Sequence, residues 1–350
     1  MKKKIIIAPL NWGIGHATRC VPIINELIKN GFEPIITSDG DALRYLEKEF
    51  PKLQSFELPS YNIQYSSKAY FFKLKILSQV PKIYKAVAEE NKVIQQIITE
   101  ENIQGIISDN RFGVYSKKIP SIYVTHQLNV FSGITTFFTS KIHQKIMKKF
   151  DEIWIPDNEK INLSGKLSKV NKFDVPIKYI GLLSRFNEVK TQNTKYKHDV
   201  LVLLSGIEPQ RSILENLLIK ELSATSKKIL FVQGKIAPKQ NIADTDNITF
   251  IDFLKQEALK KALLESELVI ARSGYSTIMD LAVLHKKAFF IPTPNQQEQE
   301  YLASHLEKLK IAAFSSQNNF KVEMLNKTSN YTGFVAHFSK EALNFELFFK

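Results

Sequence analysis

The chain has 350 residues, of which 44% are hydrophobic and 24% charged, and its formal net charge is +13. This length exceeds what a single hydrophobic core usually serves, so we expect two globular domains. No apolar run approaches the roughly 18 residues of a membrane-spanning helix, and a single cysteine, Cys20, excludes a disulfide framework and a cysteine-based zinc site. The apolar run that follows the first lysines is too short for a secretory signal, so we expect a cytoplasmic protein.

The first part of the chain alternates short β-branched runs with helical patterns, which is typical of a parallel sheet with crossover helices. In chain order we expect a strand at 3–10, a helix at 16–30, a strand at 32–38, a helix at 41–49, a strand at 53–59, a helical region at 69–100, strands at 103–109 and 119–125, a helix at 134–149 and a strand at 152–157. These elements predict a Rossmann-like domain over residues 1–190.

The polar stretch 184–199 interrupts the pattern and is predicted to be a linker, after which the same alternation starts again. Expected elements are strands at 199–206, 227–234, 248–254, 267–274 and 287–294, and helices at 210–222, 255–265, 275–284 and 296–309. The predicted fold class is α/β, with a second Rossmann-like doubly wound domain over 197–334. Residues 335–350 are expected to form a last helix that packs back on the N-terminal domain.

A glycine loop with a histidine, PLNWGIGHATR at 9–19, follows the first strand. Gly13 and Gly15 resemble part of a dinucleotide-binding fingerprint, with Asp39 as a candidate ribose ligand, but Thr18 stands where the third glycine or alanine belongs. His16 falls in the first turn of the next helix, where the helix dipole keeps an imidazole neutral and basic. The loop therefore fits a dinucleotide, a general base, or a glycine turn with an incidental histidine.

Two further polar residues end neighbouring strands of the first half. Asp109 and His126 follow strands at 103–109 and 119–125, so both are expected at the carboxyl edge of the sheet near His16. There they can share acid and base chemistry, or serve as hydrogen-bonded structural residues. Asp41 is expected to cap the helix that follows it.

The second half has three polar segments just after strands. Residues 272–277 begin a helix whose first amides can receive a phosphate, with Asp280 one turn further on, and Ser205, Gly206 and Arg211 lie in a similar segment. Two such helix starts can hold a diphosphate without a metal ion, so we expect no metal ion at this site. A run of amides and carboxylates at 292–300 suits sugar hydroxyls, although it also fits an ordinary surface loop.

Residues 58–88 contain five lysines, no acid and many aromatic or aliphatic side chains. Basic amphipathic segments of this kind lie on anionic membranes, so we expect a peripheral site on the inner face of the membrane. The alternative is a helix that packs its apolar face on the sheet and leaves its lysines in solvent. No nucleic-acid-binding signature accompanies the charge, so no nucleic-acid partner is expected.

The motifs of the second half, in this order, resemble the C-terminal domain of family 28 glycosyltransferases. The family's Arg-Ser-Gly-x-x-Thr-x-x-Glu nucleotide segment is similar to Arg272, Ser273, Gly274, Thr277 and Asp280, with Asp in place of the ribose-binding Glu. Phe253 and Leu254 resemble the segment that meets the base, and Gln299 and Glu300 the glutamine pair for the donor sugar. The phosphate loop is matched loosely by Ser205 and Gly206. In the first half, the glycine loop with His16 and the segment from His126 to Asn129 resemble acceptor-side motifs.

The resemblance implies two Rossmann-like domains facing a cleft, the GT-B fold. It implies a metal-independent, inverting transfer of a hexosyl or N-acetylhexosaminyl group from a UDP-sugar, as donor substrate, to a glycan or lipid-linked acceptor. His16, Asp109 or His126 would be the base, with Gly13, Gly15 and Asn129 on the acceptor side. The alternatives are a nucleotide-sugar 2-epimerase and a non-catalytic nucleotide-sugar-binding protein, and an NAD enzyme ranks below both.

Overall fold

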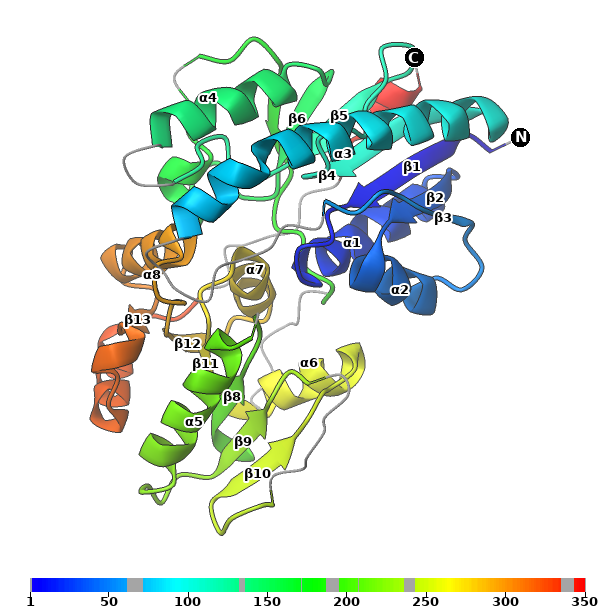
Figure 1. Cartoon of the computed structure of the whole chain (residues 1–350). Helices are drawn as coiled ribbons and strands as arrows, with labels where there is room; N and C mark the ends of the chain where they lie inside the picture. The colour runs from blue at the N-terminus through cyan, green and yellow to red at the C-terminus, as the bar shows by residue number, and fades with distance from the viewer. Residues whose placement is uncertain are drawn as a thin grey trace. The chain divides into compact units, whose positions relative to one another are not determined.

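Figure 1 shows the computed structural model of the chain, which divides into two compact units. Unit 1 is Met1–Leu183 with Lys340–Lys350, and unit 2 is Ser184–Ser339. The structure describes residues 2–61, 72–131, 136–170, 172–186, 195–206, 208–235, 243–334 and 343–349, with the backbone alone for 72–81, 137 and 138.

The described part of unit 1 contains a seven-stranded parallel sheet in the order β3-β2-β1-β4-β5-β6-β7. Its strands are β1 (Lys4–Pro9), β2 (Glu33–Ser38), β3 (Ser55–Glu57), β4 (Ile103–Asp109), β5 (Ser121–Val124), β6 (Glu152–Ile155) and β7 (Ile177–Tyr179). Its α-helices are α1 (Gly15–Lys29), α2 (Gly40–Glu49), α3 (Phe72–Glu100) and α4 (Thr136–Met147). In Figure 1, α1 and α2 lie next to β1 and β2, and α3 runs past β4.

Unit 2 repeats this arrangement with a six-stranded parallel sheet, β10-β9-β8-β11-β12-β13, in its described residues. Its strands are β8 (His198–Leu203), β9 (Ile229–Val232), β10 (Ile248–Ile251), β11 (Ser266–Ala271), β12 (Lys287–Phe290) and β13 (Ala313–Phe314). Its α-helices are α5 (Gln210–Leu222), α6 (Gln256–Leu264), α7 (Tyr275–Val283) and α8 (Gln297–Lys308). The predicted fold class of two Rossmann-like α/β domains is confirmed.

The central strands are buried on both faces, which explains their near-continuous apolar sequence. Ile5, Ile6 and Ile7 of β1 are all fully buried, and in register Ile6 lies between Ile35 of β2 and Ile106 of β4. The helix that follows β1 ends where Gly31 adopts a φ of +82°, a left-handed conformation that glycine takes without strain.

The structure corrects the prediction for Asp41, which lies inside the first turn of α2 and pairs with Arg44 at 2.7 Å. Asp39 occupies the position that precedes this helix, without a capping bond from its side chain. The short edge strands β7 and β13 were not predicted, because two or three residues carry no periodic signal. Part of the predicted linker, 187–194, lies outside the described residues, and β8 begins within the rest of it.

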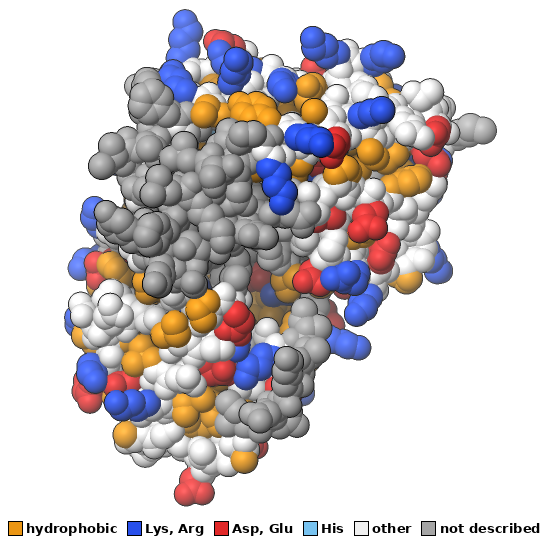
Figure 2. All heavy atoms as spheres, in the orientation of Figure 1, with side chains coloured by type: hydrophobic (Ala, Val, Ile, Leu, Met, Phe, Trp, Pro, Cys, Tyr) orange, Lys and Arg blue, Asp and Glu red, His pale blue; other side chains and the backbone are white. Residues whose placement is uncertain are grey.

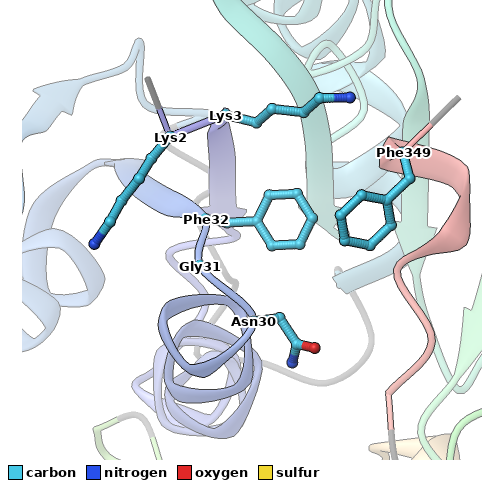
Figure 3. Close-up of a pocket in the computed structure, with 6 residues that line it drawn as sticks. All are labelled: Lys2, Lys3, Asn30, Gly31, Phe32 and Phe349. Carbon is cyan, nitrogen blue, oxygen red and sulfur yellow. The ribbon is translucent and has the colours of Figure 1, made fainter.

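The C-terminal residues pack on unit 1. The ring of Phe345 lies 5.8 Å from that of Phe32 and 5.8 Å from that of Trp154, and Lys3 donates to the carbonyl oxygen of Phe348 at 2.8 Å. Of the helix predicted over 335–350, residues 335–342 and 350 lie outside the described part, and Glu346–Phe348 form a single 3₁₀ turn. Figure 3 shows a pocket at this end of the unit, lined by Lys2, Lys3, Asn30, Gly31, Phe32 and Phe349.

Candidate functional site

Each sheet has a point where the strand order changes direction, between β1 and β4 in unit 1 and between β8 and β11 in unit 2. Ligands of open α/β sheets bind outside the carboxyl ends of the strands at such points. The loop after β1 leads to His16, and β4 ends at Asp109. In unit 2, Ser205 and Gly206 follow β8, and the segment from Arg272 to Gly274 follows β11.

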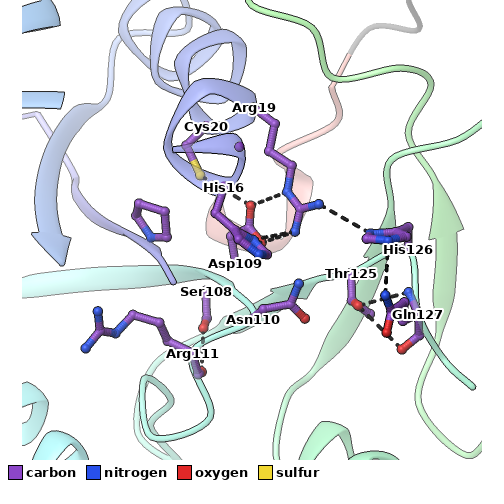
Figure 4. A network of polar contacts seen from close by, with 12 residues as sticks. His16, Arg19, Cys20, Ser108, Asp109, Asn110, Arg111, Thr125, His126 and Gln127 are labelled. Carbon is purple, nitrogen blue, oxygen red and sulfur yellow. Dashed lines mark hydrogen bonds and ion pairs between the residues drawn. The ribbon is translucent and has the colours of Figure 1, made fainter. Parts of the chain in front are cut away.

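His16 and Asp109 meet at this point of unit 1 (Figure 4). Pro9 at the end of β1 is paired in register with Asp109 at the end of β4, and the short loop after Pro9 brings the chain back over this edge. Nδ1 of His16 lies 2.9 Å from Oδ1 of Asp109. The His16 side chain is 16% exposed, whereas that of Asp109 is fully buried.

Arg19 is central to this cluster, and the sequence analysis missed it. Its Nε donates to Oδ2 of Asp109, its NH2 group donates to Oδ1, and NH2 also lies 2.8 Å from Nδ1 of His16. Arg19 follows His16 by three residues in α1, so the two side chains share one face of the helix. The sequence did contain a signal for Arg19. It is a charged residue three positions after His16 and directly before the apolar run that begins at Cys20.

His126 joins the same cluster from the loop after β5. Its Nδ1 lies 3.3 Å from NH1 of Arg19, its Nε2 lies 3.4 Å from the side-chain amide of Gln127, and the residue is buried. The structure therefore brings all three candidate acid or base residues, His16, Asp109 and His126, around one guanidinium.

The electrostatics of the cluster favour a neutral imidazole beside an ionised carboxylate. Burial and the charge of Arg19 lower the pKa of His16 below its ordinary value. Burial alone would favour the protonated form of Asp109, but the Arg19 charge and His16 hold its pKa well below its usual range. A neutral histidine next to a carboxylate is suited to accept a proton and stabilise the resulting charge.

The three residues expected on the acceptor side differ in their surroundings. Gly13 has a φ of +72° with open space where a Cβ would lie, and Gly15 begins α1. Asn129 is placed elsewhere in its loop, because its side-chain amide donates to the carbonyl oxygens of Lys166 and Lys169 at 2.9 and 2.6 Å. Its contacts are those of a residue that ties two loops together.

A second buried charge cluster in unit 1 was also missed. Arg111 is fully buried and pairs with Asp39 and with Glu90 of α3, each at 2.5 Å. Tyr61 donates to Glu90 at 2.5 Å, and Asn11 donates to the other oxygen of Asp39 at 3.1 Å. The carboxylate of Asp39, the candidate ribose ligand of the dinucleotide interpretation, is thus held by Arg111 and Asn11.

In unit 2, the two loops predicted to bind a diphosphate have free space next to their glycines. Gly206 has a φ of +112°, and neither it nor Gly274 would have any atom within 4 Å of an added Cβ. Gly274 immediately precedes α7, and Ser205 and Gly206 precede α5 and are exposed. A ligand can therefore approach the backbone at both loops.

Arg272 does not point to an open loop. Its NH1 group donates to the carbonyl oxygens of Ile291 and Pro292, both at 3.0 Å, and NH2 donates to the backbone oxygen of Gln210 and to Gln317. Burial lowers its pKa to about 10, so the guanidinium remains charged at neutral pH. Its contacts make Arg272 a brace between the start of α5, the end of β12 and the segment near Gln317.

Arg211 is braced in a similar way. Its guanidinium is buried, contacts Glu208 and Glu215, and donates to the backbone oxygen of Gln233 at 3.2 Å. Lys235 pairs with the same Glu215 at 3.0 Å. Two cations and two carboxylates thus compensate each other in this loop, so the cluster offers no excess positive charge to a phosphate.

Asp280, the candidate ribose ligand, lies buried in α7. It accepts hydrogen bonds from Ser184 at 2.6 Å and from Nε of Arg185 at 3.2 Å. Burial raises its pKa above the ordinary value, against the opposing effect of Arg185.

The remaining candidates lie around this edge of the unit 2 sheet. Ser273 donates to the backbone oxygen of Gln299 at 2.7 Å, which joins the nucleotide segment to the predicted sugar-binding segment. The side chains of Gln299 and Glu300 accept from the backbone of Thr293 and Asn295, both at 2.9 Å. Phe253 is 39% exposed before α6, and Leu254 and Thr277 are half-buried.

Two properties follow from the described residues alone. Among them, no group of three or more His, Cys, Asp or Glu side chains is arranged to hold a metal ion. In the same part of the chain, no helix combines the length and the apolar character needed to cross a membrane.

Residues 211–331 match the model of the glycosyltransferase family 28 C-terminal domain. The chain is also similar to the UDP-N-acetylglucosamine–N-acetylmuramyl-(pentapeptide) pyrophosphoryl-undecaprenol N-acetylglucosamine transferase of Buchnera aphidicola. The two are 26% identical over 348 residues, which cover 94% of this chain and 89% of the relative. The enzyme of the same name from Haemophilus ducreyi is 23% identical over 337 residues, covering 93% and 88%.

Solved glycosyltransferases share the fold at low sequence identity. The glycosyltransferase of kitacinnamycin superposes with a TM-score of 0.66 at 12% identity, covering 93% of this chain and 89% of that one. MurG of Acinetobacter baumannii superposes with a TM-score of 0.54 at 12% identity, covering 95% and 93%. These likenesses support the GT-B type of two Rossmann-like domains.

Proposed function

Since the chain belongs to glycosyltransferase family 28, we propose that it transfers a hexosyl or N-acetylhexosaminyl group from a UDP-sugar to a hydroxyl group of a lipid-linked acceptor. The names of the relatives support a UDP-sugar donor and a lipid-linked acceptor. The observation that carries the proposal is the contact of the partly exposed His16 with the buried Asp109, at the point where the strand order of unit 1 changes direction.

The proposed reaction is inverting and needs no metal ion. His16 takes the proton from the acceptor hydroxyl, and the acceptor oxygen attacks the anomeric carbon as the bond from that carbon to the diphosphate breaks. The electron pair of the broken bond leaves on UDP. Asp109 stabilises the imidazolium that forms, and a positioned base of this kind contributes about 10²- to 10⁴-fold to the rate.

Unit 2 is proposed to hold the donor. The backbone at Gly206 and Gly274, ahead of α5 and α7, would receive the diphosphate, because the first amides of a helix favour anions. Asp280 would bind the ribose, the Phe253 and Leu254 segment the base, and the Gln299 and Glu300 segment the sugar. Arg272 would act by holding these loops, as would Arg211, because both guanidinium groups have protein partners.

Residues 58–88 are proposed to face an anionic membrane that carries the acceptor, with the protein peripheral on the cytoplasmic side. Lys68, Lys73 and Lys75 lie outside the residues whose side chains are described, but Lys82 and Lys85 are exposed on α3. Figure 2 shows Lys and Arg side chains gathered over the α3 and α4 part of unit 1. Residues 1–190 carry 28 Lys and Arg against 18 Asp and Glu, which favours an anionic surface.

The decisive test is release of UDP from a panel of UDP-sugars, with and without an undecaprenyl-linked acceptor in vesicles. Release that requires the acceptor and survives a chelator supports the proposal. Release without any acceptor would favour a 2-epimerase or hydrolase, and binding of UDP-sugars without turnover would favour a sensor. An anomeric configuration retained in the product would contradict the inverting mechanism.

A further inference from the structure

The candidate acid and base residues of unit 1 meet at Arg19, the last residue of the glycine-loop motif, to which the sequence assigned no role. We propose that Arg19 is a positioning residue that holds Asp109 against His16 and keeps His126 as a hydrogen-bond donor. The role in the reaction rests on the proposed function, whereas the geometry and its test do not require turnover.

The contact between Arg19 and Asp109 has the form of a fork. Nε and NH2 of Arg19 each donate to a different oxygen of Asp109, and both side chains are buried. A bidentate guanidinium fixes the plane of a carboxylate, which the single ammonium group of lysine cannot do. Cys20 adds a third contact to the carboxylate, with its Sγ 3.7 Å from Oδ2. Asp109 is thus oriented toward His16 and is not presented to a substrate hydroxyl.

The same guanidinium decides the role of His126. A guanidinium has five N–H donors and no acceptor, so Nδ1 of His126, 3.3 Å from NH1 of Arg19, must accept. The ring proton of His126 then lies on Nε2, 3.4 Å from the side-chain nitrogen of Gln127, so this amide must turn its oxygen toward the ring to accept the proton. In this tautomer His126 can donate a hydrogen bond but has no nitrogen left on its outer side to take a proton.

His16 contacts both members of the Arg19 and Asp109 pair. Its Nδ1 lies 2.9 Å from Oδ1 of Asp109 and 2.8 Å from NH2 of Arg19, so this nitrogen contacts both partners. The charged or titratable groups around its ring are Arg19 from its own helix, Asp109 from β4 and His126 from the loop after β5. Burial and the positive charge of Arg19 lower the pKa of His16 and oppose a second proton, which keeps the ring neutral.

The tautomers and titration of the two histidines test this inference directly. We would label histidine with ¹⁵N in the whole protein, assign the two rings with His16→Gln and His126→Gln, and follow ring nitrogens by NMR against pH. We expect His126 protonated on Nε2 in the wild type. In Arg19→Gln the titration midpoint of His16 should move to higher pH, because a nearby positive charge is lost. Arg44→Gln, at an exposed position of α2, should leave the midpoint unchanged.

Either of two results overturns the inference: wild-type His126 protonated on Nδ1, or the same His16 midpoint in Arg19→Gln and in the wild type. If Arg19→Gln does not fold, the wild-type tautomer decides alone. Arg19→Lys keeps the charge but not the fork, so kcat should fall about 10- to 100-fold with donor affinity retained, as expected for a misplaced group. If the histidine spectra are as expected but the protein transfers no sugar, the proposed function is contradicted and the inference about Arg19 stands.

Discussion

The hydroxyl of Ser184 donates to the carboxylate of Asp280 at 2.6 Å, within unit 2. Asp280 is the residue that the family motif assigns to the ribose of the nucleotide, and Ser184 is the first residue of the unit. The chain segment that enters the unit is thus attached to the proposed nucleotide site by a buried hydrogen bond.

Asp280→Ala should weaken UDP binding by roughly 1.5 to 3 kcal/mol, because a charged hydrogen bond to the ribose is lost. Ser184→Ala is the matched control, since it removes a partner of the carboxylate but keeps the carboxylate itself. Its UDP affinity should change less than that of Asp280→Ala. Calorimetry with UDP on both folded variants measures the difference, and equal affinity in Asp280→Ala and wild type would remove Asp280 from the site.

His16→Ala should lower turnover by about 10²- to 10⁴-fold, the usual contribution of a general base. UDP binding should be retained, because the nucleotide is assigned to unit 2. In the wild type, kcat/KM should decline on the acid side as His16 gains a proton, at a pH below that of an ordinary imidazole. Steady-state kinetics across pH measure both effects, and near-normal turnover of the variant would exclude His16 as the base.

Arg272→Met should destabilise unit 2 by at least about 2 kcal/mol, because several carbonyl oxygens around the buried guanidinium lose their donor. Hydrogen exchange of peptides that cover residues 291–292 and 317 should become faster. Arg44→Met, at an exposed position of unit 1, is the control. Unchanged exchange at these peptides would show that Arg272 does not brace the loops.

His143 should make unit 1 less stable in acid. Burial lowers its pKa to about 4, whereas the unfolded chain has the ordinary value of 6.5, so the unfolded state binds the proton first as pH falls. Stability is complete above pH 6.5 and declines toward pH 4 by up to about 3 kcal/mol. Both tryptophans, Trp12 and Trp154, lie in unit 1, so urea unfolding followed by their fluorescence reports on this unit.

In His143→Gln, this part of the pH dependence should disappear, whatever the effect of the substitution at neutral pH. An unchanged slope of the unfolding free energy between pH 6.5 and 4 would assign the acid sensitivity to another group.

Tyr61→Phe should cost unit 1 about 1 to 3 kcal/mol. Its hydroxyl donates to Glu90 at 2.5 Å and accepts from the backbone of Phe112 at 2.8 Å, so both partners lose a hydrogen bond in a buried cluster. Tyr84→Phe is the matched control, because Tyr84 is 61% exposed. Equal urea midpoints for the two variants would contradict the role of Tyr61.

Local sequence patterns predicted the alternation of strands and helices, the two Rossmann-like units and the family resemblance of the second unit. Periodic burial and glycine positions are local properties, and strands such as β1 and β11 are long enough to show them. The glycine loop and the strand ends also identified His16, Asp109 and His126, because parallel strands bring their carboxyl ends to one edge.

The contacts of those residues could not be predicted, because they depend on long-range packing. Arg19 and Asp109 are separated by 90 positions, Arg111 and Asp39 by 72, and no local pattern relates them. The motif places Arg272 where a phosphate ligand is expected. The carbonyl groups that it binds instead belong to residues up to 62 positions away in the chain. A buried guanidinium binds the acceptors that the packed fold brings within reach, so the role of each arginine is set by long-range packing and not by its neighbours in sequence.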